Sequence, residues 1–208
     1  MPPLHDKKKT IAVVRDYAAK LEAEPAVQNM KKLGTAMVAD MTNYTGGLPT
    51  RNFSAGQFVD IDNDTLLLGG QHVYERNVER GGDPSHACMP GCVIMCSNVY
   101  VDKDGKEMVS PLEYETLGLM GSNCGVGDPD DIARVNNIAN DLGIDTIETG
   151  ATLGILMDGG KAEYGDVDFM VSSLEDIRLG NENGRLLAKG TARVGEHYGI
   201  KRVPGIKQ

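Results

Sequence analysis

The spacing of apolar residues along this chain is mostly helical. The clearest segment runs from Asp128 to Gly143, where apolar residues recur every three or four positions and form one stripe. The stripe consists of Ile132, Val135, Ile138, Ala139 and Leu142. Pro129 suits the first position of a helix, and Gly143 suits the residue that follows one. We therefore predict a helix with defined ends in this segment.

Similar signals predict helices over most of the remaining chain. These helices are expected from Asp6 to about Glu22, between Pro25 and Gly34, from Asp64 to Arg80, from Ser110-Pro111 onward, and over residues 145–157, 173–178 and 184–197. Residues 45–62 contain several Gly and Pro residues and a polar run, so a long loop is predicted there.

One β signal interrupts the helical pattern. Residues 98–102 and 106–109 flank the turn dipeptide Asp104-Gly105, which is typical of a two-stranded hairpin. The chain has no internal repeat and no linker long enough to force a domain boundary. The predicted fold is mainly α, a single multihelical domain over residues 1–208 with one short β-hairpin near residues 98–109.

Composition excludes several classes of function. With 208 residues, 40% of them hydrophobic, the chain is long enough to bury a core. A formal net charge of −9 and the lack of a basic stripe argue against nucleic acid and anionic membrane surfaces as partners. No apolar stretch reaches 18 residues and the N-terminus lacks a secretory h-region, so we expect a cytoplasmic protein with reduced thiols.

The chemistry of the chain is concentrated in three cysteines within nine residues. Cys88, Cys92 and Cys96 are soft ligands for iron or zinc, and three crowded thiols make a poor disulfide framework. Pro90-Gly91 argues against a helix there and favours a loop around a metal centre. Since such centres need four ligands, the fourth must be Cys124, a histidine such as His86, or a residue outside this chain.

Several motifs in the same order resemble those of the aldehyde:ferredoxin oxidoreductases, which are tungsten or molybdenum pterin enzymes. They are the segments Gly46–Phe53, Glu113–Thr116, Gly121–Gly125 and Asn140–Thr146, together with the cysteine triplet. Enzymes of that family have three domains. The resemblance implies that this chain is the helical middle domain with the start of the C-terminal region.

The resemblance also implies roles for individual residues. Cys88, Cys92 and Cys96 match three ligands of a 4Fe-4S cluster whose fourth cysteine lies in the third domain, although the family more often has two residues between the first two cysteines. A pterin-binding motif is matched by Asn140, Gly143, Ile144 and Asp145, with Asn140 standing where some members carry Asp.

Further candidates follow from the same resemblance and from general chemistry. Aldehyde oxidation releases protons, so a buried glutamate of the Glu113–Thr116 motif could act as the base. Glu113 and Glu115 are two apart on a predicted helix, so only one can face the metal, and we favour Glu113 over a solvated role for both. Arg51 and Asn52 could approach a pterin phosphate or simply anchor their loop.

Three functions remain open at this point. The first is a domain of a tungsten- or molybdenum-bis-pterin oxidoreductase that converts aldehydes to acids and passes electrons through the 4Fe-4S cluster to ferredoxin or an electron-transfer subunit. This chain would then need the remaining domains and be inactive alone. The second is a self-contained zinc or iron-sulfur module with Cys124 as fourth ligand, and the third is a helical scaffold without a cofactor. In the first case, we expect the turn at residues 140–150 to lie on the same side of the domain as the cysteine loop.

Overall fold

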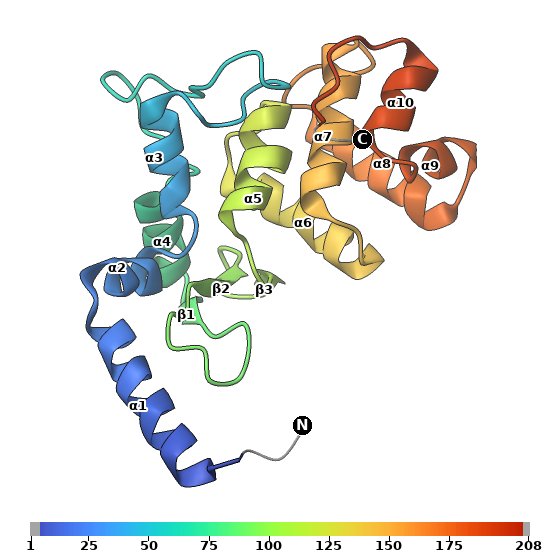
Figure 1. The fold of residues 1–208 in the computed structure, drawn as a ribbon. Helices are drawn as coiled ribbons and strands as arrows, with labels where there is room; N and C mark the ends of the chain where they lie inside the picture. Colours follow the sequence, from blue (N-terminus) through green and yellow to red (C-terminus); the bar gives the residue numbers. More distant parts are fainter. Residues whose placement is uncertain (1–4, 206–208) are drawn as a thin grey trace.

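The computed structural model describes residues 5–205, and these residues form a mainly α-helical fold with one small sheet, as the sequence predicts (Figure 1). The helices in chain order are α1 (Lys7–Ala23), α2 (Pro25–Leu33), α3 (Met37–Thr45), α4 (Gly70–Glu79), α5 (Tyr114–Thr116), the π-helical turn η1 (Leu117–Gly121), the 3-10 turn η2 (Ser122–Cys124), α6 (Pro129–Leu142), α7 (Thr146–Asp158), α8 (Val167–Leu179), α9 (Glu182–Leu187) and α10 (Thr191–Tyr198).

The sheet is antiparallel, with the strands in the order β1, β2, β3. The strands are β1 (Asp83–His86), β2 (Ser97–Val101) and β3 (Glu107–Val109). The predicted hairpin is confirmed as β2 and β3, and its turn is closed by the Asp102 N–H donating to the Lys106 carbonyl at 2.8 Å. The sequence did not predict β1, which pairs with β2. Because the cysteine loop connects β1 to β2, the sheet holds both ends of that loop.

Helix starts are confirmed where an aspartate caps the first turn. The carboxylates of Asp6, Asp128 and Asp145 each accept a hydrogen bond from a backbone N–H of the helix that follows, α1, α6 or α7. Gly143 ends α6 in the left-handed conformation that glycine tolerates, with φ of 70°. These local signals explain why the boundaries of α6 and α7 agree with the sequence prediction.

The predicted boundaries of α1 and α2 also agree with the structure, whereas those of several later helices were wrong. The helix expected from Asp64 begins only at Gly70, whose N–H donates to Asp40 at 2.7 Å, and the chain after Ser110-Pro111 becomes helical only at Tyr114. The helix expected over residues 173–178 begins at Val167. Helix α3 was not predicted.

The single helix predicted over residues 184–197 is two helices, α9 and α10. They are separated at Gly190, which has φ of 83°, and a Cβ at this position would lie 2.7 Å from the Glu148 carboxylate. The break therefore depends on a contact with α7, which a local sequence pattern does not reveal.

The core lies between α6, α7 and η1, and it extends to the sheet where α6 packs against β3. Tyr100, Leu117, Ile132 and Leu153 are among its buried side chains. Helix α7 approaches η1 closely because Gly150 has no side chain, and a Cβ there would lie 2.5 Å from the backbone of Leu119. This packing fixes the segment that follows Glu113 against the N-terminal half of α7.

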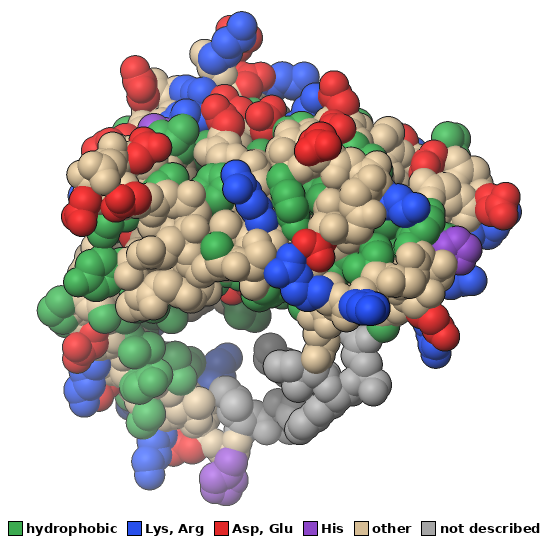
Figure 2. All heavy atoms as spheres, turned by 90° about the horizontal axis from the view of Figure 1, so that it is seen from above, with side chains coloured by type: hydrophobic (Ala, Val, Ile, Leu, Met, Phe, Trp, Pro, Cys, Tyr) green, Lys and Arg blue, Asp and Glu red, His purple; other side chains and the backbone are tan. Residues whose placement is uncertain are grey.

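Charged side chains of both signs are interspersed over the face shown in Figure 2. Within residues 5–205, no helix is long and apolar enough to cross a membrane. Helix α1 stands apart from the other elements, projecting away from the body of the molecule in Figure 1.

Candidate functional site

The three clustered cysteines lie on the loop between β1 and β2. Cys88 is exposed, whereas Cys92 and Cys96 are half-buried, and all three are free thiols. The loop turns at Gly91, with φ of 84°, and at Met95, a non-glycine residue with φ of 51°. Left-handed backbone at a residue other than glycine is unfavourable. The loop therefore adopts a specific turn rather than the helix that cysteines four apart could also form.

The thiols of this loop are close enough to influence one another. The backbone N–H groups of Met95 and Ile94, with a smaller effect of the Cys88 thiol, lower the pKa of Cys92. Burial raises the pKa of Cys96, and the negative charge of Glu113 and the other two thiols raise it further. Backbone N–H groups directed at a sulfur stabilise a thiolate, the form in which cysteine binds a metal.

The fourth cysteine does not belong to this group. Cys124 is fully buried in the core, and its thiol donates to the carbonyls of Leu119 and Gly150, both at 3.4 Å. Burial raises the pKa of Cys124 to about 12, so the thiol is protonated. This placement argues against the predicted alternative in which Cys124 is the fourth ligand of a self-contained site. The exposed His86 ring lies 3.2 Å from Asp83, at the end of β1.

The two glutamates have different environments. Glu113 is the half-buried residue that precedes α5, close to Cys96. Burial raises the pKa of Glu113, the negative charge of Glu115 adds to this, and a hydrogen bond from Ser97 opposes it. Glu115 is exposed on α5. Of the two residues, only Glu113 lies beside the cysteine loop.

The predicted pterin-binding residues lie where α6 leads into α7: Asn140 is in the last turn of α6, and Gly143, Ile144 and Asp145 form the turn that follows it. Asn140 and Asp145 are exposed, and a Cβ added at Gly143 would meet no atom within 4 Å, so the backbone is open to a ligand at this point. One carboxylate oxygen of Asp145 accepts the Glu148 N–H at 2.7 Å, while no hydrogen bond within the described chain uses the other. Ile144 is half-buried beneath the turn.

This turn and the cysteine loop are connected through α5. The hydroxyl of Thr116, at the end of α5, lies 2.9 Å from the hydroxyl of Thr146, the first residue of α7. Just before α5, Glu113 accepts a hydrogen bond from Ser97, the residue after Cys96, and its negative charge raises the pKa of Cys96. One helical turn therefore bridges the two segments.

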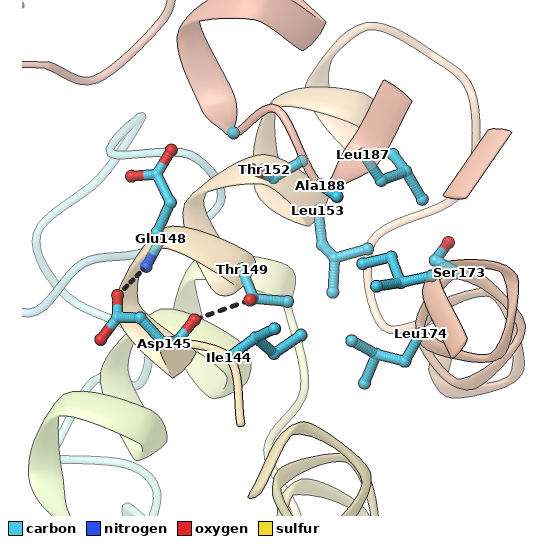
Figure 3. A pocket seen from close by; sticks show the side chains of 12 residues that line it. Ile144, Asp145, Glu148, Thr149, Thr152, Leu153, Ser173, Leu174, Leu187 and Ala188 are labelled. Carbon is cyan, nitrogen blue, oxygen red and sulfur yellow. Dashed lines mark hydrogen bonds between the residues drawn. The ribbon is translucent and has the colours of Figure 1, made fainter. Parts of the chain in front are cut away.

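A pocket of about 220 Å³ opens beside the same turn. Figure 3 shows Leu153, Leu174 and Leu187 converging on it from α7, α8 and α9, while the carboxylates of Asp145 and Glu148 lie on the other side of the view. The turn thus has a polar edge and an apolar flank.

The loop that carries Arg51 and Asn52 has an unusual backbone. Arg51, Asn52 and Phe53 have φ of 45°, 52° and 56°, three consecutive left-handed residues other than glycine. Each such residue costs roughly 1–2 kcal/mol, so tertiary contacts must hold the segment. The N–H groups of Arg51 and Asn52 donate to the carbonyls of Ser122 and Asn123, both at 3.0 Å.

Asn52 is fully buried, and its amide donates to Asp158 and to the Arg202 carbonyl. These bonds make it an anchor of the loop, the alternative role considered for it. Its Oδ1 atom has no hydrogen-bond partner within residues 5–205, and the same is true of the buried Oδ1 of Asn123. Arg51 is exposed and open to a ligand.

The donor groups fit the cofactors that the sequence suggests. The cysteine loop offers three thiols with backbone N–H donors, and the turn offers an amide and a carboxylate oxygen to the polar edge of a ring. Within residues 5–205, no three Cys, His, Asp or Glu side chains are already arranged around a common metal position. The ligand assignment of Cys88, Cys92 and Cys96 stays a prediction, and so does the assignment of the pterin contacts.

Two residues without a predicted role hold this region together. The buried Asn123 donates to the Gly150 carbonyl at 3.4 Å, and Asp158 accepts from Asn52, Tyr164 and Arg202. Asn123 lies in the segment Gly121–Gly125, and membership of that motif was the only sequence signal for its role. Asp158 had no sequence signal, because its partners come from distant segments.

Comparison with known proteins agrees with the motif resemblance. Residues 12–205 match the family model described as aldehyde ferredoxin oxidoreductase, domains 2 and 3. The tungsten-containing aldehyde ferredoxin oxidoreductases of Thermococcus kodakarensis and Pyrococcus furiosus are each 29% identical over 95% of this chain. A Pyrococcus furiosus protein named aliphatic sulfonate oxidoreductase, WOR-like subunit, is 28% identical over 50% of the chain and 19% of its own length. The chain spans about a third, 33%, of the length of the first two relatives.

Proposed function

This chain belongs to the aldehyde ferredoxin oxidoreductase family, and we propose that it is the middle, cofactor-holding domain of a tungsten- or molybdenum-pterin enzyme. The enzyme would oxidise aldehydes to carboxylic acids and pass the electrons to ferredoxin or an electron-transfer subunit. When bound, the pterin metal would supply the two-electron oxidation and the 4Fe-4S cluster would carry the electrons away. The chain contributes ligands and contacts to both cofactors, while the remaining domains complete them.

The proposed contributions are specific. Cys88, Cys92 and Cys96 hold three corners of the cluster, and the fourth ligand comes from another domain. Asn140 and Asp145 hydrogen-bond the polar edge of a pterin, while Gly143 allows the backbone to approach it. Arg51 offers a guanidinium to a phosphate.

The bridge formed by α5 is the observation that best supports this proposal. Electrons must pass from the pterin site to the cluster, so the residues assigned to the two cofactors should lie close together. Thr116 bonds to Thr146 at the start of α7, and Glu113 accepts a hydrogen bond from Ser97, the residue after Cys96. A chain in which the packed core separated these segments would not suit the function.

Glu113 is the residue that we assign to proton transfer. Its carboxylate is half-buried at the start of α5, within the segment that connects the two cofactor regions. A carboxylate held there can accept a proton released by the oxidation. Glu115 on the exposed side of α5 is not positioned for that role.

Anaerobic reconstitution of the chain with ferrous iron and sulfide tests the proposal. Because one ligand is external, we expect a cluster to form only when a small thiol such as 2-mercaptoethanol is added, as measured by visible absorption, EPR and iron content. Substitution of serine for Cys88, Cys92 or Cys96 should abolish the cluster. Cys124→Ser is the matched control and should retain it.

Other outcomes would overturn the proposal. A full cluster or zinc site without added thiol that is lost in Cys124→Ser would support the self-contained module. No iron under either condition would support the scaffold. We also expect no aldehyde-dependent reduction of a viologen dye by this chain alone, even when tungsten or molybdenum cofactor is supplied, because part of the cofactor-binding site lies in other domains.

A further inference from the structure

The pocket beside the turn between α6 and α7 has walls built from side chains of the core. Its volume is about 220 Å³, and α7, α8 and α9 each supply part of its apolar lining. That lining consists of Leu153, Leu174, Ile177 and Leu187, and each of the three leucines is at most 5% exposed. An apolar cavity of about 150 Å³ in a protein core is large enough to bind benzene. This pocket is therefore large enough for a ring with a short substituent.

One buried hydroxyl of the pocket is free to bond to a ligand. Ser173 of α8 is only 3% exposed and lines the pocket, and its hydroxyl has no hydrogen-bond partner in the described part of the chain. The other hydroxyls of the lining are already bonded. Thr149 donates to the Asp145 carbonyl at 2.6 Å, and Thr152 lies 3.0 Å from the Thr191 hydroxyl. A ligand that carries an oxygen atom would give the Ser173 hydroxyl the partner it lacks.

The charged groups of the pocket are both acidic. Asp145 and Glu148 are exposed, and in Figure 3 they lie on the opposite side of the view from Ser173. None of the residues that line the pocket is a lysine, an arginine or a histidine. A ligand carboxylate would have to leave water for apolar walls with a single free donor, and two carboxylates would repel it. The pocket should therefore exclude anions.

We propose that this pocket binds a small uncharged molecule with an aromatic or short alkyl body and one hydroxyl or carbonyl group. The body packs against the leucines, and the oxygen atom bonds to Ser173. A ligand of about eight non-hydrogen atoms should have a dissociation constant of about 0.1–1 mM.

A molecule in this pocket would also contact the turn. Ile144 and Asp145 line the pocket, and both belong to the segment that we assign to the pterin. This link to the cofactor rests on the proposed function, whereas the binding itself does not.

NMR titration of the isotope-labelled chain with benzyl alcohol tests the proposal. The backbone amide signals of Leu153, Ser173 and Leu187 should shift and saturate with a dissociation constant of about 0.1–1 mM. Benzoate has the same ring and nearly the same size but carries a negative charge, so it should bind at least about tenfold more weakly. The chain is used without cofactors, so the result does not depend on whether a cluster can be reconstituted.

Substitution of Ser173 tests the assigned hydrogen bond. Ser173→Ala should weaken the binding of benzyl alcohol about tenfold and leave the binding of toluene, which lacks the hydroxyl, unchanged. The toluene measurement also checks that the pocket of this variant is intact. Ser172→Ala is the matched control, because the exposed Ser172 donates to the Phe169 carbonyl at 2.9 Å and does not line the pocket. It should bind benzyl alcohol as the parent chain does.

A neutral substitution of Glu148 tests the exclusion of anions. Glu148→Gln keeps a side-chain oxygen that can accept the Thr191 N–H, but it removes one of the two negative charges. It should strengthen the binding of benzoate about threefold and leave that of benzyl alcohol unchanged. Glu182→Gln is the control, because Glu182 is exposed on α9 and does not line the pocket.

Three results would overturn the inference. Benzyl alcohol that causes no saturable shift at the pocket residues, even about tenfold above the expected dissociation constant, would show that the pocket does not take this class of molecule. Benzoate that binds as tightly as benzyl alcohol would contradict the exclusion of anions. Equal affinities of Ser173→Ala and Ser172→Ala for benzyl alcohol would contradict the role of Ser173.

Discussion

Asp130 joins α4, the sheet and α6, and its replacement by asparagine should destabilise the fold strongly. Its carboxylate accepts two hydrogen bonds from Arg80, at 2.7 and 2.9 Å, and one from the Tyr100 hydroxyl at 2.6 Å. Tyr100 is fully buried, and the Arg80 side chain is only 17% exposed. In Asp130→Asn, the amide nitrogen would face a donor, and one acceptor and the negative charge would be lost.

The size of the effect follows from these contacts. A hydrogen bond to a charged group contributes about 1.5–3 kcal/mol, and partners left unsatisfied in a buried position add to the loss. The Asp130 side chain is 35% exposed, so water and salt screen part of the interaction. We expect Asp130→Asn to lower the free energy of unfolding by about 2–3 kcal/mol at neutral pH.

The effect should depend on pH in a defined direction. Burial alone would raise the pKa of Asp130, but the hydrogen bonds from Arg80 and Tyr100 outweigh it and lower the pKa. A carboxyl with a depressed folded-state pKa stabilises the fold above its unfolded pKa, and this contribution is lost as the pH falls through the folded pKa. The difference between the parent chain and Asp130→Asn should therefore shrink on acidification.

The neighbouring Asp131 provides a matched control. It is exposed, and burial together with the charge of Asp128 raises its pKa, so its negative charge disfavours the fold. Urea unfolding followed by circular dichroism should show Asp131→Asn to be neutral or slightly stabilising at neutral pH. The reasoning is refuted if the two asparagine variants have free energies of unfolding within about 0.5 kcal/mol of each other.

Two further outcomes are expected. Gly154→Ala should reduce the free energy of unfolding by about 1–3 kcal/mol, because its Cβ would lie 2.5 Å from the Asn123 amide nitrogen. Gly47→Ala is the control in the same urea assay, because a Cβ at Gly47 would lie no closer than 3.8 Å to another atom. Equal decreases in the free energy of unfolding for the two variants would contradict the packing argument. In the folded chain, iodoacetamide should alkylate the exposed Cys88 and the half-buried Cys92, whose pKa is lowered, but it should reach the buried Cys124 only after unfolding. Peptide mass spectrometry measures the order of labelling. Labelling of Cys124 in the native state at a rate comparable to that of Cys88 would contradict this expectation.

Sequence alone predicted the elements whose signals are local. Helices α6 and α7 begin at capping aspartates, Asp128 and Asp145, and α6 ends at Gly143, so neighbouring residues were enough to set these boundaries. Strand β1 carries no such signal. Its residues include Pro84 and have little tendency to form a strand, and the strand exists because β2 pairs with it.

The candidate site likewise combines features with local sequence signals and features that depend on distant segments. The cysteine triplet and the turn at Gly143 were identifiable because each is a short run of sequence. The buried position of Cys124 could not be identified from the sequence, because it depends on α7 packing over η2. A thiol beside a glycine turn is compatible with either a metal ligand or a core residue. The bridge between Thr116 and Thr146 likewise depends on how α5 meets α7.

Asn52 has a consequence for the order in which the chain folds. Its side chain bonds to residues 106 and 150 positions further along the sequence, Asp158 and Arg202. Closing loops of that length costs more entropy than forming the local caps of α6 and α7, so we expect the left-handed segment to dock late, after α7 has formed. Until then, no tertiary contact holds Arg51 and Phe53 in their unfavourable backbone conformation. The loop would complete the fold only when both distant partners are already in place.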